Sequence, residues 1–178
     1  MSAAKLARAW LALALGLAAA IAGAQQSSEP AVKAAFLYKF AGYVEWPVPP
    51  QPDAPFVIAT LAGEDVAAEL ARILPGRAIA GRPAVVRTVR EGEPLAGVQM
   101  LFVGRRVPDP RAAIRAAQQQ GVLTVTETSL DSGAAINFLV AESRVSFEVS
   151  LEAAERSGHR ISSRMLAVAR RVLPKGAP

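Results

Sequence analysis

The chain has 178 residues, and its 20 lysine and arginine residues against 15 aspartate and glutamate residues give a formal net charge of +5. It contains no cysteine and a single histidine, His159, which excludes disulfides, cysteine nucleophiles, thiolate metal sites and a histidine-rich metal site within one chain. No run of basic residues exceeds two, and no basic stripe is interleaved with aromatic residues, so we expect no nucleic-acid binding.

The first 24 residues have the three-part pattern of a secretory signal. Lys5 and Arg8 give a basic start, residues 10–21 form an apolar run, and the small residues 22–24 form a cleavage site. A helix that spans a bilayer needs roughly 20 apolar residues, so a cleaved signal is favoured over an uncleaved anchor. The sequence therefore predicts a signal peptide over 1–24 and one exported domain over 25–178, whose 18 basic and 15 acidic residues leave a net charge of +3.

A helix is predicted next, capped by Ser27 or Ser28. Pro47 disfavours helical geometry in the residue before it, so we expect this helix to end at Trp46. Its predicted core face carries apolar residues at helical spacing, while lysines and a glutamate lie elsewhere. The core-face residues are Val32, Phe36, Phe40, Tyr43 and Val44, and the others are Lys33, Lys39 and Glu45. Four prolines within 48–55 predict a turn-rich loop.

The middle of the chain alternates between apolar strands and helices. Strands are predicted at 56–61, 83–89, 98–103 and 122–126. One helix follows residues 63–65 and stops at Pro75-Gly76, and another opens at Pro108 or Asp109 and stops at Gly121. Such alternation indicates a largely parallel sheet with helices on both faces.

The pattern changes near the C-terminus. Only three residues separate strands predicted at 134–140 and 144–149, which requires an antiparallel hairpin. Alternation of apolar and polar residues in the second strand predicts one solvated face. A short helix over 151–156, a turn around His159 and a last helix from Ile161 complete the chain, with Arg170 and Arg171 in its final turns. The predicted fold is a single three-layer α/β domain, with a largely parallel sheet of about six strands that ends in the hairpin.

No nucleotide-binding, hydrolase or metalloprotease motif is present, so we predict no catalytic residue, metal or cofactor. Polar residues follow two predicted strands, where an α/β sheet usually binds its ligands. Glu64 and Asp65 are the crevice candidates, and the loop 126–131 lies near the same edge. The more economical interpretation is that Gly63 makes a turn and Glu64 or Asp65 caps the next helix.

Five of the ten aromatic residues lie within residues 36–46. Phe36, Phe40 and Tyr43 share the predicted core face, whereas Tyr38 points away from it. Trp46 lies beside the proline-rich loop, where burial is favoured but an exposed aromatic would form a protein-binding hot spot. Tyr38 and Trp46 are therefore the candidate partner-binding residues.

Two blocks of the sequence resemble the YfiR family of bacterial periplasmic proteins. The opening block comprises residues 31–40 and 44–47, and the closing block comprises 147–149, 153–154, 156–158 and 161–166. Gly63, the segment 81–83 and the strand 122–125 also fit, so the resemblance covers nearly all of residues 25–178.

The resemblance implies a regulatory protein and not an enzyme. Members of the family repress a membrane-bound diguanylate cyclase by binding its periplasmic sensor region, which lowers cyclic di-GMP and biofilm formation. Well-studied members carry disulfides, so the absence of cysteine here excludes a thiol-based redox switch. The alternative is a periplasmic small-ligand binding protein that feeds a sensor kinase or transporter, and an exported hydrolase is a weaker third reading. The sequence does not decide whether the protein forms a homodimer.

Overall fold

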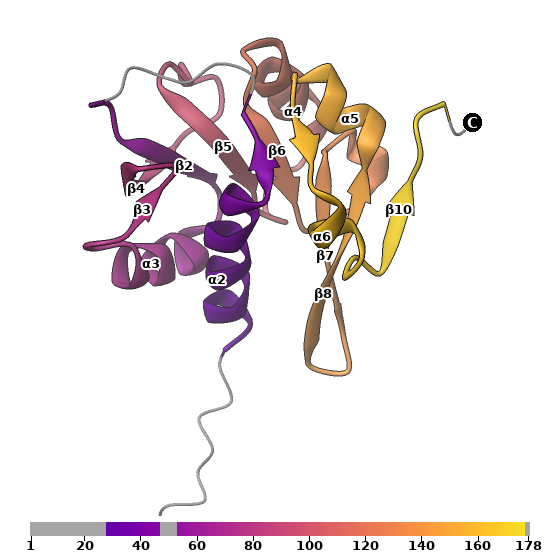
Figure 1. Ribbon diagram of the computed structural model, residues 1–178, viewed down its shortest axis with the longest axis horizontal. Coiled ribbons are helices and arrows are strands. Elements are labelled where there is room, and N and C mark those ends of the chain that lie inside the picture. The colour runs from indigo at the N-terminus through magenta and orange to yellow at the C-terminus, as the bar shows by residue number, and fades with distance from the viewer. Residues whose placement is uncertain (1–27, 47–52, 177–178) are drawn as a thin grey trace, which may run out of the picture.

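The structure is a computed structural model that describes residues 28–46 and 53–176 (Figure 1). Its centre is an eight-stranded sheet with the strand order β10-β8-β7-β6-β5-β2-β4-β3. The predicted signal segment 1–24 and most of the proline-rich loop lie outside the described residues.

The predicted architecture is confirmed. In chain order, the strands of the sheet are β2 (Phe56–Leu61), β3 (Ala78–Ile79), β4 (Arg82–Val89), β5 (Val98–Val103), β6 (Leu123–Thr126), β7 (Ile136–Ala141), β8 (Arg144–Ser150) and β10 (Arg171–Leu173). The neighbours from β4 to β7 are parallel, while β7 and β8 form the antiparallel hairpin. The sheet exceeds the expected six strands because the short edge strands β3 and β10 were not predicted.

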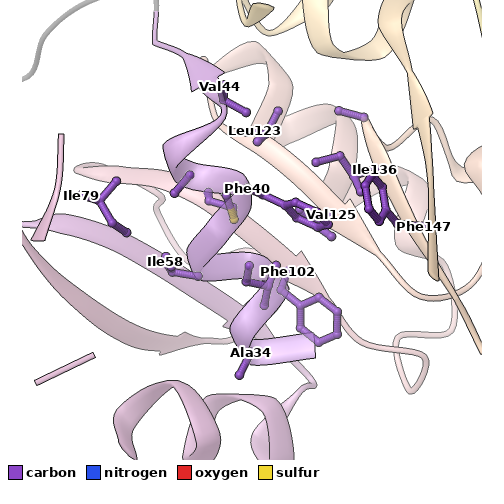
Figure 2. Packing of buried hydrophobic residues seen from close by; sticks show 14 of the residues in the cluster. Ala34, Phe40, Val44, Ile58, Ile79, Phe102, Leu123, Val125, Ile136 and Phe147 are labelled. Carbon is purple, nitrogen blue, oxygen red and sulfur yellow. The ribbon is translucent and has the colours of Figure 1, made fainter. Parts of the chain in front are cut away.

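Helices cover both faces of this sheet. The face covered by α2 (Glu29–Gly42), α3 (Glu64–Ile73), α5 (Leu151–Arg156) and α6 (Ser163–Leu166) has an aromatic core, part of which is drawn in Figure 2. Within it, the rings of Phe40 and Phe147 lie 4.8 Å apart, edge to face. The opposite face packs against α4 (Pro110–Gln119), whose Ile114 and Ala117 are fully buried. The predicted starts are confirmed: Ser28 caps α2, and Asp109 caps α4.

The first helix is shorter than predicted. It ends at Gly42 instead of Trp46, and Val44–Glu45 form a strand, β1, that pairs antiparallel with β9 (Arg160–Ile161). Glycine is a poor helix former, and pairing with β9 gives the backbone around Val44 its hydrogen bonds. As a result Tyr43 is 43 % exposed and does not join the core face on which it was predicted.

The predicted C-terminal helix is wrong beyond its first turn. Helix α6 has four residues, and Arg171–Leu173 instead form β10, which pairs parallel with β8. The edge of β8 leaves backbone groups that a further strand can satisfy, and this pairing overrides the local helical pattern. Arg171 therefore does not lie in a helical turn; its Nε lies 2.8 Å from a carboxylate oxygen of Glu148.

The hairpin strand β8 lacks the clean solvated face that alternation predicted. Glu148 is only 7 % exposed, because Arg171 and the amide of Asn137 contact its carboxylate. A buried carboxylate needs such partners, so the polar residue here marks an internal contact and not a wet face.

Candidate functional site

The carboxyl ends of three parallel strands meet at one edge of the sheet and open into a polar crevice of about 310 Å³. Its walls come from the residues that follow β2, β5 and β6 and from the first turn of α2. We call this the charged crevice; it is lined by Glu29, Pro30, Ala62, Asp65, Arg105, Arg106 and Glu127. The sequence predicts a crevice at this edge, since ligand sites of α/β sheets lie there.

A buried lysine lies beneath the charged crevice. Lys33 is 1 % exposed, and its Nζ contacts the carboxylates of both Glu29 and Glu127. Arg105 reaches the same two carboxylates from the rim, with its guanidinium 2.7 Å from Glu29 and 3.0 Å from Glu127. Its backbone N–H also donates to Glu127, at 2.9 Å. Two cations and two carboxylates thus form one network.

This network fixes the charge of its members. The hydrogen bond from Lys33 lowers the pKa of Glu29. For Glu127, burial alone would raise the pKa, but the hydrogen bonds from Arg105 and Lys33 outweigh it and the pKa is lowered. The hydrogen bond to Glu127 raises the pKa of Arg105. Both carboxylates are therefore held ionised and engaged, which suits a structural or recognition role better than proton transfer.

The two crevice candidates lie at the rim. Asp65 lines the charged crevice and accepts a hydrogen bond from the Val66 N–H at 2.9 Å. Glu64 pairs with Arg106, and both side chains are mostly exposed. The helix cap of α3 is Gly63 itself, so the expectation that Glu64 or Asp65 caps this helix is wrong. A Cβ at Gly63 would lie 2.6 Å from the Phe102 ring, which explains a glycine at this cap.

The residues of the polar loop 126–131 lie in different surroundings and do not form one site. Only Glu127 lines the charged crevice. Thr126 is buried and its hydroxyl donates to the Val103 carbonyl at 3.3 Å, while Ser129 caps a short 3₁₀ helix, η1 (Leu130–Ser132). Asp131 lies in a different groove, beside α4.

The two aromatic candidates have different surroundings. Tyr38 is half-buried; its hydroxyl donates to the Ala78 carbonyl at 3.4 Å, and the Arg77 guanidinium lies 5.2 Å from the centre of its ring. These are surface contacts at the edge of the sheet. The ring also packs against the aromatic core, so Tyr38 presents only part of it, beside the Arg77 cation, at the protein surface.

Trp46 is half-buried and packs inward. Its ring lies 4.9 Å from that of Phe56 and 4.8 Å from that of His159, edge to face in both cases. Its indole N–H donates to the Ala41 carbonyl at 3.1 Å. His159 is 1 % exposed, and burial lowers its pKa to about 4, so it is neutral at physiological pH. His159 lies between α5 and the strand β9, not between two helices as predicted.

Three residues of this edge were not identified from the sequence. Lys33 was placed away from the core face, and Arg105 and Arg106 were not singled out. A signal did exist, because Glu29 and Lys33 are four residues apart on a helix and the arginine pair directly follows a strand. That Lys33 is buried depends on Glu127, which is distant in sequence.

The comparison with protein families gives one match. The model of a family described as YfiR/HmsC-like matches residues 30–170. A search of curated proteins found no match. Among residues 28–46 and 53–176, no three histidine, cysteine, aspartate or glutamate side chains gather as a metal site would require, and no helix there has the length and apolar character to cross a membrane.

Proposed function

Because this chain belongs to the YfiR/HmsC-like family, whose members regulate cyclic di-GMP signalling from the periplasm, we propose that it represses a membrane-bound diguanylate cyclase. It does so by binding the periplasmic sensor region of that enzyme. The family match, which covers residues 30–170 and so runs from α2 to the residue before β10, carries this proposal.

The arrangement of the two recognised blocks supports it. The opening block supplies α2 and β1, and the closing block supplies β8, α5, β9 and α6. These elements contact one another: β1 pairs with β9, the Ser162 N–H donates to the Tyr43 carbonyl at 2.9 Å, and Phe40 packs against Phe147. The residues that carry the resemblance therefore build one continuous unit of the fold.

The proposed contact surface lies around Tyr38. A tyrosine ring with a neighbouring arginine is the residue combination that anchors many protein interfaces. Trp46 remains a second candidate, although its ring already packs against Phe56 and His159.

Binding only the inactive state of the sensor region would shift the population of the cyclase toward that state. A complete shift, from 1:99 to 99:1, needs about 5.5 kcal/mol of differential affinity.

Deletion of the gene tests the proposal. We expect cyclic di-GMP and surface adhesion to rise in the deletion strain and to return to normal when the wild-type gene is restored. Unchanged cyclic di-GMP under several growth conditions would contradict the proposed repression.

A Tyr38→Ala variant tests the contact surface. Restoring the gene as this variant should leave cyclic di-GMP high, while the purified variant still folds and unfolds in one transition, at a somewhat lower temperature because the half-buried ring packs against the core. Tyr43→Ala is the matched control, since Tyr43 is an exposed tyrosine near the same helix and we expect it to restore repression fully. If both variants restore repression equally, Tyr38 is not a contact.

A further inference from the structure

We propose that a groove between α4, η1 and α5 binds a small anionic molecule that also carries an apolar part. We call it the arginine groove. This site is separate from the charged crevice and does not depend on the proposed function. Its volume is about 570 Å³, which lies within the range of roughly 300–1,000 Å³ found for small-molecule sites. In Figure 1, α4 and α5 lie at the same end of the molecule.

Three arginines surround the arginine groove. Arg111 and Arg115 are four residues apart on α4 and so share one side of that helix, and Arg156 comes from the last turn of α5. Arg156 is held in place by Glu152, 2.8 Å away. None of the ion pairs within residues 28–46 and 53–176 includes Arg111 or Arg115.

The positive charge of the arginine groove is not balanced from within. Its lining has three arginines but only one acidic residue, Asp131, so positive charge is in excess. The charged crevice is different, because both of its arginines are paired with carboxylates there. Guanidinium groups without such partners offer paired N–H donors to a carboxylate, phosphate or sulfonate.

The inner wall of the arginine groove is fixed by the core. Ile114 lies behind it and is fully buried. Gln118 is 8 % exposed, and its amide donates to the Gly133 carbonyl at 2.7 Å, so it closes the wall without presenting that donor to a ligand. The aliphatic stems of the exposed arginines supply the apolar surface that a ligand can reach. A ligand with both an acidic group and an apolar body would use both parts of this wall.

The fluorescent probe 8-anilinonaphthalene-1-sulfonate, an aromatic sulfonate, has the required chemistry. We expect the purified protein to bind one probe molecule saturably. The double variant Arg111→Gln/Arg115→Gln should weaken that binding by about ten-fold or more, because two charge-assisted hydrogen bonds are lost. Its melting temperature should stay that of the wild type, since both side chains are exposed.

The control is the double variant Arg144→Gln/Arg164→Gln. It removes the same charge from two exposed arginines outside the arginine groove, and we expect binding within about two-fold of the wild type. Equal weakening in both double variants, or no saturable binding, would overturn the site. Benzoate should displace the probe at a lower concentration than inorganic phosphate does; equal potency would overturn the apolar contact.

Discussion

At the scale of single residues, the burial of Lys33 is the least expected feature of this protein. Its ammonium group is enclosed because Glu29 and Glu127 contact it from two elements. Removing one partner of a buried ion pair leaves the opposite charge without compensation, which lowers the free energy of unfolding by about 3 kcal/mol. We expect Lys33→Ala to lower the free energy of unfolding by that amount in urea titrations.

The control for this prediction is Lys39→Ala on the same helix. Lys39 is exposed, so its removal should change the unfolding free energy by less than about 0.5 kcal/mol. The double variant Lys33→Met/Glu127→Leu should regain most of the stability, because a buried ion pair can be replaced by apolar residues of similar size. Lys33→Ala and Lys39→Ala variants of equal stability would contradict the buried network.

His159 makes stability depend on pH. Its pKa is about 4 in the folded protein, against about 6.5 in an unfolded chain. Between these values the unfolded chain binds a proton that the folded protein does not, so stability is full above pH 6.5 and falls as the pH drops toward 4. The expected loss is about 3 kcal/mol, measured as the unfolding free energy across this window.

A His159→Gln variant should flatten that slope, whatever its absolute stability. The amide can still bond the Ser157 hydroxyl, which lies 3.0 Å from the histidine Nδ1. The lowered pKa values of Glu29 and Glu127 act in the same direction, but only below about pH 4.5, where free carboxylates take up protons. An unchanged slope between pH 4 and 6.5 would show that His159 does not cause it.

At the scale of elements, the carboxyl edge of the sheet depends on a close approach of two strand ends. A Cβ on Gly104, just after β5, would lie 2.1 Å from the carbonyl oxygen of Ala62, just after β2. Backbone cannot move aside as a flexible side chain can, so Gly104→Ala should cost about 2–3 kcal/mol in thermal or urea unfolding. Gly42→Ala, at the end of α2 with open space around it, should be neutral or stabilising by up to about 1 kcal/mol.

Elements were predictable where the local pattern and the tertiary contacts agree. Strand β2 is a continuous apolar run, and all six of its residues are buried. Helix α4 has a capping Asp109, a proline in its first turn and a glycine shortly after its end. The strands that were not predicted are β1, β3, β9 and β10, which are short and depend on backbone partners in other strands.

At the scale of the whole molecule, two cores share one sheet. Residues of β2 and β5 alternate between the aromatic core under α2 and the core under α4, so loss of either face exposes the other. We therefore expect one cooperative unfolding transition. Far-UV circular dichroism, which follows the sheet and helices, should report the same urea midpoint as the fluorescence of Trp46, which packs against the aromatic core. Separate midpoints would contradict a single unit.

The candidate site was only partly predictable at this scale. The sequence placed Glu64 and Asp65 at the carboxyl edge, because parallel strands bring their ends together. It did not reveal that Glu127, Arg105 and Lys33 neutralise one another there. It also gave no sign of the arginine groove, since Arg156 and α4 are neighbours only in the folded chain.

The sequence alone determined the α/β alternation, the hairpin, the caps of α2 and α4 and the resemblance to the YfiR family, because spacing and local chemistry encode each of these within a short stretch of chain. Tertiary structure alone decided which charges are buried, where α2 ends and that Arg171–Leu173 form a strand and not a helix. Those outcomes depend on partners far away in sequence, and the cost of leaving a buried charge or backbone group unpaired exceeds local helical or strand preference.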